Sequence, residues 1–254
     1  MRKSFTKSDL EKMFQSIGAK LLCKMEIFLL GGGAMCFRNQ KNATKDLDLV
    51  FKNADDFKAF AEAINAIGFS EPKAIESIYK EMKPAGIWEN KDNFRLDLFV
   101  KKVCGALELS EKMTARAELL ANYGNLAVKI VSNEDVILFK GITERLDDTN
   151  DIAAIIRTSD VDWEIILQEC IAQSQARAWY GSLCNKLVEI NEKHGITAPI
   201  IRKLQKLDEK ERLQDACKMR LKTGLTRKET AAELLQLGFK KKEIEDAMAN
   251  DTPA

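Results

Sequence analysis

The chain has 254 residues, of which 45% are hydrophobic and 31% are charged. This composition is typical of a folded globular protein with one large domain or two modest ones, and it excludes a disordered chain. The net charge of +1 excludes nucleic-acid binding through a strong overall positive charge, so any such site has to be a local patch.

The histidine and cysteine content limits the kinds of metal site and catalytic site that the chain can form. Because His194 is the only histidine, the sequence argues against a zinc site built from several histidines and against a Ser-His-Asp triad. The six cysteines are scattered without a C-x-x-C pair, which indicates reduced and mostly buried thiols. The longest apolar run, residues 27–37, is too short to span a bilayer and contains three glycines. We therefore expect a cytoplasmic protein without a membrane partner.

The first elements are a helix, a strand and a glycine-rich turn. Apolar residues recur with a helical period over residues 8–22, which predicts a helix with Ser8 as its N-cap. A buried strand is predicted at residues 27–30, followed by a turn at the three glycines 31–33. A short helix is expected over residues 34–37.

Two acidic residues lie in the next strand, residues 46–51. Since side chains alternate along a strand, Asp46 and Asp48 point to the same face, and the residues around them are apolar. Two carboxylates on such a face repel each other and are costly to desolvate. A divalent cation with oxygen ligands is the usual remedy. The alternative is that both acids lie on the exposed face of an edge strand.

A third acid occurs in a later strand. A helix is predicted from Asn53, with Gly68 as its stop. The strand pattern then returns at residues 78–79, 86–88 and 94–100. Asp97 lies in the middle of the last of these strands, which we expect to be a sheet neighbour of the strand with Asp46 and Asp48. Three converging carboxylates would form an oxygen-rich site suited to Mg²⁺.

The remaining sequence is mainly helical. The pattern predicts a helix at residues 110–116, a hairpin at 119–131, helices at 132–142, 149–157, 163–173, 176–193, 198–207 and 209–222, and two short helices after Thr226 and Lys240. Strand patterns stop well before a boundary near residues 158–162. We therefore predict an α+β fold, with a small mixed sheet flanked by helices in residues 1–158 and an all-α C-terminal domain in residues 159–254.

The order of these motifs resembles the nucleotidyltransferase superfamily that includes DNA polymerase β. In that superfamily an apolar strand and a Gly-Gly pair precede an Asp-x-Asp motif, and thirteen residues separate the two here. The nearer resemblance is to stand-alone prokaryotic nucleotidyltransferases of the abortive-infection toxin type, which often read G-G-x-A and then R-x-T-x-D-[IL]-D. Residues 31–34 match the first pattern and residues 44–48 match most of the second, whereas Asn42 stands where the pattern has Arg.

A further match lies in the helical segment that follows. Residues 134–140 and 145–152 resemble the family pattern E-D-L-[IL]-x-x-K…R-x-K-D-x-x-D-[IL], with Asp147 in place of the second Lys. This resemblance implies that Lys140 binds the nucleotide phosphates and that Asp148 and Asp151 help to form the site. The alternative for the two acids is stabilisation of a helix N-terminus through the helix dipole.

The resemblance implies a reaction as well as a fold. It implies a nucleotidyltransferase (EC 2.7.7-type) that uses Mg²⁺ or Mn²⁺ to move a nucleoside monophosphate from a nucleoside triphosphate such as ATP to an acceptor hydroxyl. Asp46, Asp48 and Asp97 would be the catalytic residues and metal ligands. The implied nucleotide-binding residues are Gly31, Gly32, Thr44, Lys140, Asp148 and Asp151, with the glycine turn offering backbone N–H groups to phosphate.

The resemblance also implies partners, namely a tRNA 3′ end or a protein side chain as acceptor and an antitoxin as inhibitor. The alternative function is that of a catalytically inactive, nucleotidyltransferase-like binding or regulatory protein that acts through its helical domain. The replacement of the family Arg by Asn42 favours this alternative.

Overall fold

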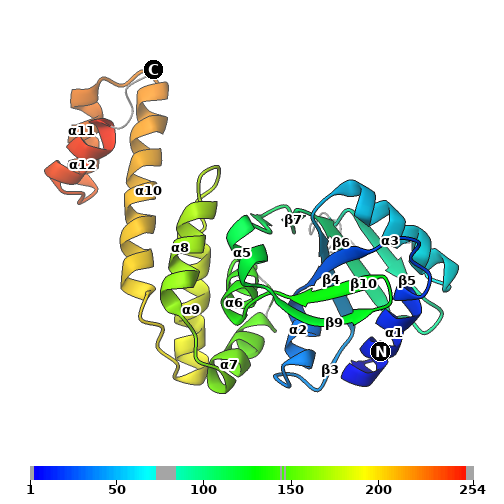
Figure 1. Ribbon diagram of the computed structural model, residues 1–254. Coiled ribbons are helices and arrows are strands. Elements are labelled where there is room, and N and C mark those ends of the chain that lie inside the picture. The colour runs from blue at the N-terminus through cyan, green and yellow to red at the C-terminus, as the bar shows by residue number, and fades with distance from the viewer. Residues whose placement is uncertain (1–2, 73–83, 144, 146, 250–254) are drawn as a thin grey trace.

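The protein is built around a six-stranded mixed sheet (Figure 1). The computed structural model describes residues 3–72, 84–143, 145 and 147–249. In sheet order the strands are β5 (Gly86–Glu89), β6 (Arg95–Val100), β4 (Asp46–Phe51), β2 (Met25–Leu29), β10 (Leu126–Ile130) and β9 (Glu118–Tyr123). The pairs β4–β6 and β2–β10 are parallel and the others are antiparallel. The predicted strand at residues 78–79 lies outside the described residues.

Helices flank the sheet and form the C-terminal part of the chain, which confirms the predicted fold class. They are α1 (Lys7–Gly18), α2 (Gly31–Phe37), α3 (Ala54–Ala66), α5 (Glu111–Arg116), α6 (Asn133–Gly141), α7 (Asp148–Thr158), α8 (Trp163–Gln173), α9 (Tyr180–His194), α10 (Ile201–Lys222), α11 (Arg227–Gln236) and α12 (Lys241–Ala249). Two small sheets were not predicted: β1 (Phe5–Thr6) pairs with β3 (Ala43–Thr44), and β7 (Lys102–Val103) pairs with β8 (Leu107–Glu108).

Helix α1 is shorter than the sequence pattern indicates. Thr6, not Ser8, is its N-cap, and Thr6 forms a capping box with Asp9. The helix ends at Gly18, where an added Cβ would collide with the backbone of the β9–β10 hairpin. Leu22, expected on the buried stripe, is 99% exposed. The prediction of a helix as far as residue 22 is therefore wrong.

Helix α2 begins at the first glycine, so the prediction of a turn followed by a helix from Ala34 is wrong. The glycines form its first turn because the helix packs very close to neighbouring strands. An added Cβ would collide with the Asp48 carboxylate at Gly31 and with Leu47 and Leu29 at Gly33. Only residues without a side chain allow this approach.

Within the described residues, the hydrophobic core has two parts. The first extends from Phe5 to Leu204 and includes residues of the sheet and of α6 to α9, so it continues across the predicted boundary at residues 158–159. The second lies between α10, α11 and α12 and includes Leu213, Cys217, Leu234 and Ile244. Figure 1 shows α10 extending away from the sheet with α11 and α12 at its far end.

Helix α10 is one continuous helix of 22 residues, so the prediction of two separate helices in this region is wrong. Asp208 and Glu209 resemble a helix start in the sequence, but they lie in the middle of α10. There the Asp208 carboxylate pairs with Arg212 one turn later, with 2.8 Å between Oδ2 and Nε.

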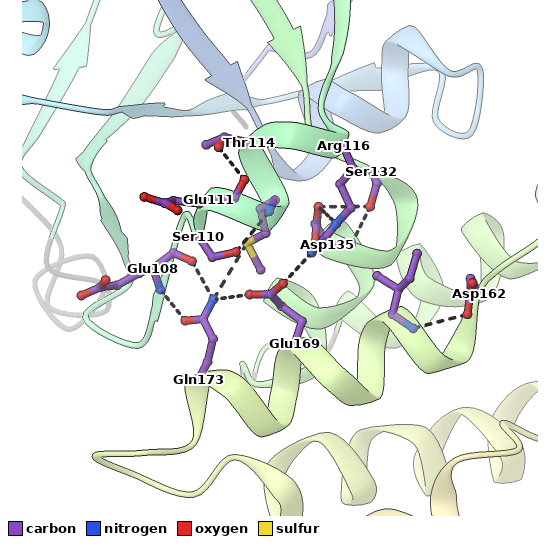
Figure 2. A network of polar contacts seen from close by, with 12 residues as sticks. Glu108, Ser110, Glu111, Thr114, Arg116, Ser132, Asp135, Asp162, Glu169 and Gln173 are labelled. Atoms are coloured by element: carbon purple, nitrogen blue, oxygen red, sulfur yellow. Dashed lines mark hydrogen bonds and ion pairs between the residues drawn. The ribbon is translucent and has the colours of Figure 1, made fainter.

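A network of polar contacts links α8 to α5 and α6 (Figure 2). Arg116 on α5 donates from Nε to Asp135 Oδ2 on α6 at 2.9 Å and from Nη2 to Glu169 Oε2 on α8 at 2.9 Å. Both carboxylates are buried. One guanidinium therefore links α8 to the first turn of α6, which fixes the helix that carries Lys140 in its last turn.

The structure also bears on the predictions about the cysteines and about membrane-spanning helices. The six cysteines, all within the described residues, are free, and four of them are buried, as expected. In the part of the chain that the structure describes, no helix combines the length and apolar character needed to cross a bilayer.

Candidate active site

Strands β4 and β6 bring the three predicted acids together. In their parallel register Asp48 is the partner of Asp97, and Asp46 is the partner of Arg95. Since paired residues of neighbouring strands point to the same face, these four side chains share one face of the sheet. The alternative of an edge strand is wrong, because β4 lies between β6 and β2.

The Asp48 carboxyl group has a strongly raised pKa. Burial raises its pKa, and the nearby charges of Asp46 and Asp97 raise it further, to about 7. The ionised form of Asp48 is therefore less favourable than that of an exposed aspartate. A bound proton or a divalent cation would remove this cost.

Asp97 is held by a residue that the sequence analysis missed. Arg95 and Asp97 are 1% and 2% exposed. The Arg95 Nε donates to Asp97 Oδ1 at 2.7 Å, and its Nη2 contacts Oδ2, so the pair is bidentate. Burial raises the pKa of Asp97, and Arg95 only partly offsets this rise. The signal was present in the sequence, since Arg95 and Asp97 have the same spacing of two as Asp46 and Asp48.

The predicted glycines begin α2, and the predicted Thr44 ends β3, two residues before β4. Gly31 has a φ of +56°, which favours glycine, and no side chain caps α2. The hydroxyl of the buried Thr44 donates to the Asp46 carbonyl at 2.9 Å. An added Cβ at Gly32 would lie 2.6 Å from that hydroxyl oxygen. The structure thus places Gly31 against Asp48 and Gly32 against Thr44.

Lys140, Asp148 and Asp151 form an ion cluster in which Lys140 and Asp148 are buried and Asp151 is half-buried. The Lys140 ammonium donates to Asp148 Oδ1 at 2.8 Å and to Asp151 Oδ2 at 2.7 Å, and Lys41 pairs with Asp151 at 2.9 Å. Burial lowers the pKa of Lys140, but Asp148 and Asp151 raise it above the ordinary value. The structure therefore brings these three predicted residues together, with Lys140 held as a cation between the two carboxylates.

Two further side chains face the acids and were not predicted. Arg145 donates from Nε to Asp148 Oδ2 at 3.2 Å. Burial lowers its pKa, while Asp48 and then Asp148 raise it above the ordinary value. Cys104, with a φ of +53°, has a pKa raised to about 12 by burial and by Asp48. Arg145 is part of the sequence motif at residues 145–152, but no role was predicted for it. Nothing in the sequence indicated Cys104.

The acidic residues fit a divalent cation through Asp46 and Asp48. Their carboxylates are hard oxygen ligands on one face, and the charge of Asp46 disfavours ionisation of Asp48, which a cation would reverse. Among the described residues, no three His, Cys, Asp or Glu side chains are grouped as a complete metal site. At this position Arg95 engages Asp97.

Sequence comparison agrees with this geometry. The family described as "Nucleotidyltransferase of unknown function (DUF6036)" matches residues 8–186, a range that contains the acids, the glycines and the Lys140 cluster. No curated protein matches the chain significantly. Because the family match covers more than half of the chain, the protein belongs to this family of nucleotidyltransferases.

Proposed function

We propose that the protein transfers a nucleoside monophosphate from a nucleoside triphosphate to an acceptor hydroxyl, with Mg²⁺ or Mn²⁺ held by Asp46 and Asp48. One observation carries this proposal: Asp46 and Asp48 share a face of β4, and Asp97 lies beside Asp48 on β6. The arrangement occurs in a chain that belongs to a nucleotidyltransferase family.

The residues of the site have separate roles in this proposal. When bound, the divalent cation would neutralise charge on the triphosphate. Gly31 and Gly32 would donate backbone N–H groups to phosphate oxygens next to Asp48. The acceptor oxygen would bond to the α-phosphorus while the bond to the β-phosphate breaks and pyrophosphate leaves. Asp97, which lies beside Asp48 on β6, would take the acceptor proton.

The acceptor is proposed from the resemblance to toxin-type relatives. A tRNA 3′ end and a protein side chain both present the hydroxyl that this reaction needs. In the same proposal, an antitoxin would be the partner that restrains the activity.

The proposal is tested by label transfer. The protein is incubated with Mg²⁺, total RNA, cell lysate and the four nucleoside triphosphates labelled at the α-phosphate, and then with the same triphosphates labelled at the γ-phosphate. We expect α-label in RNA or protein, no γ-label, and no transfer by the Asp46→Asn/Asp48→Asn variant. Tight partner binding with no label transfer under these conditions would favour the inactive binding protein.

A further inference from the structure

Arg145 contacts the Lys140 cluster through Asp148. Its Nε donates to Asp148 Oδ2 at 3.2 Å, and its side chain remains 42% exposed. The Lys186 ammonium on α9 donates to the Arg145 carbonyl at 3.3 Å and so ties this position to the helical part. A guanidinium carries four N–H donors besides Nε–H, in a planar arrangement that suits phosphate oxygens.

Arg145 also interacts electrostatically with the two acids of β4. The carboxylates that raise its pKa are those of Asp48, Asp148 and Asp46. Conversely, Arg145 is the cation that most lowers the pKa of Asp48, ahead of Lys140. Arg145 therefore supplies a positive charge that acts on both proposed metal ligands, and it is held at Asp148 with its side chain partly exposed. In the proposed site the triphosphate of a metal-bound nucleotide would lie within reach of this charge.

Lys140, to which the resemblance assigns the phosphates, is in a different situation. Its side chain is 7% exposed, and its ammonium contacts Asp148 and Asp151 at 2.8 Å and 2.7 Å. Contact with a phosphate would require Lys140 to leave the buried Asp148 and the half-buried Asp151, for which it is the shared cation, and this is costly. This cost does not arise for Arg145, because its side chain is partly exposed.

We propose that Arg145 is the side chain that binds the phosphates of the nucleoside triphosphate, while Lys140 fixes Asp148 and Asp151. This inference rests on the proposed function, and it names the phosphate-binding residue of that site. In this arrangement Asp148 has a positioning role, since it is bonded to both Lys140 and Arg145.

The test uses inorganic tripolyphosphate with Mg²⁺, which needs no knowledge of the base. Calorimetric titration compares the full-length protein with Arg145→Met, Arg145→Gln and Arg145→Lys. Arg212→Met is the matched control, because Arg212 also pairs through Nε with an aspartate and is exposed on α10.

We expect both neutral variants to weaken tripolyphosphate binding about 10-fold to 100-fold, as for the loss of charge-assisted hydrogen bonds. Arg145→Lys should retain part of the affinity, and Arg212→Met should match the unchanged protein. Circular dichroism identifies any variant that fails to fold, and the other neutral variant then decides the outcome.

Two results would overturn the inference and are distinguishable. If the unchanged protein binds tripolyphosphate and the folded neutral variants bind it equally well, Arg145 is not the phosphate ligand and the proposed function stands. If the unchanged protein binds no tripolyphosphate with Mg²⁺, the proposed function fails together with the inference.

Discussion

Arg95 and Asp97 form a bidentate ion pair within one strand, and both side chains are almost completely buried. Their spacing of two residues puts them on the same face of β6, next to Asp46 and Asp48 on β4. The third acid of the site is therefore neutralised by its own strand, whereas the first two face each other without such a partner on β4.

Removal of Arg95 should destabilise the folded protein, because Asp97 would lose its ion-pair partner. We expect Arg95→Met to lower the free energy of unfolding at pH 7 by about 3–5 kcal/mol, because it leaves the Asp97 charge buried and unpaired. The double variant Arg95→Met/Asp97→Asn removes that charge and should recover most of the loss. Urea unfolding measures both, and a double variant no more stable than the single one would contradict the account.

Asp48 should make the metal-free protein less stable as the pH rises. Its pKa is about 7 when folded, above the ordinary value near 4, so the folded protein binds a proton more tightly than the unfolded chain does. The stability that this proton contributes is present below pH ~4 and is lost as the pH rises through about 7.

Asp48→Asn removes this titration and is the direct test. In EDTA we expect the variant to be more stable than the unchanged protein at pH 8, by about 1–3 kcal/mol, and similar to it near pH 4. Urea unfolding at the two pH values gives the comparison. A difference that does not change with pH would show that Asp48 ionises normally.

Gly31 should be intolerant of any side chain. Gly31→Ala combines a left-handed backbone with a Cβ that collides with the Asp48 carboxylate, so we expect a loss of about 2–4 kcal/mol and weaker Mn²⁺ binding. Gly68→Ala is the matched control, since Gly68 has a φ of +92° with nothing within 4 Å. It should cost about 1 kcal/mol and leave Mn²⁺ binding unchanged. Equal effects in both variants would rule out a specific role of the Gly31–Asp48 contact.

Lys140 should matter for stability far more than an exposed lysine does. Lys140→Met leaves Asp148 and Asp151 without their main cation, and we expect a loss of about 3–5 kcal/mol in urea unfolding. The control is Lys203→Met, whose pair with Glu164 has side chains 61% and 53% exposed and should contribute less than about 1 kcal/mol. Similar losses in the two variants would contradict the buried cluster.

Much of the site could be predicted from local spacing. Asp46 and Asp48 were recognisable because a strand places residues two apart on one face, and Asp97 was recognisable as an acid inside an apolar strand. The same rule applied to Arg95 would have revealed the ion pair. The contacts of Lys140 with Asp148 and Asp151 depend on how α6 and α7 pack, which spacing along the chain does not determine.

The parts of the fold that were missed depend on distant contacts. The two-residue strands β1 and β3 pair across almost forty positions of sequence and carry no periodic pattern of their own. Helix α10 continues through Asp208 because an acid at that point is paired within the helix with Arg212. Cys104 reaches the acids through the β7–β8 hairpin, another pairing without a sequence signal.

The most direct test of the central claim is Mn²⁺ binding measured by electron paramagnetic resonance with a non-hydrolysable nucleoside triphosphate. We predict that the unchanged protein removes the free Mn²⁺ signal and that Asp46→Asn/Asp48→Asn does not. Asp55→Asn/Asp56→Asn, which removes two carboxylates from the first turn of α3, should bind like the unchanged protein. Equal binding by the protein with and without Asp46 and Asp48 would contradict a metal-dependent nucleotidyltransferase site on β4.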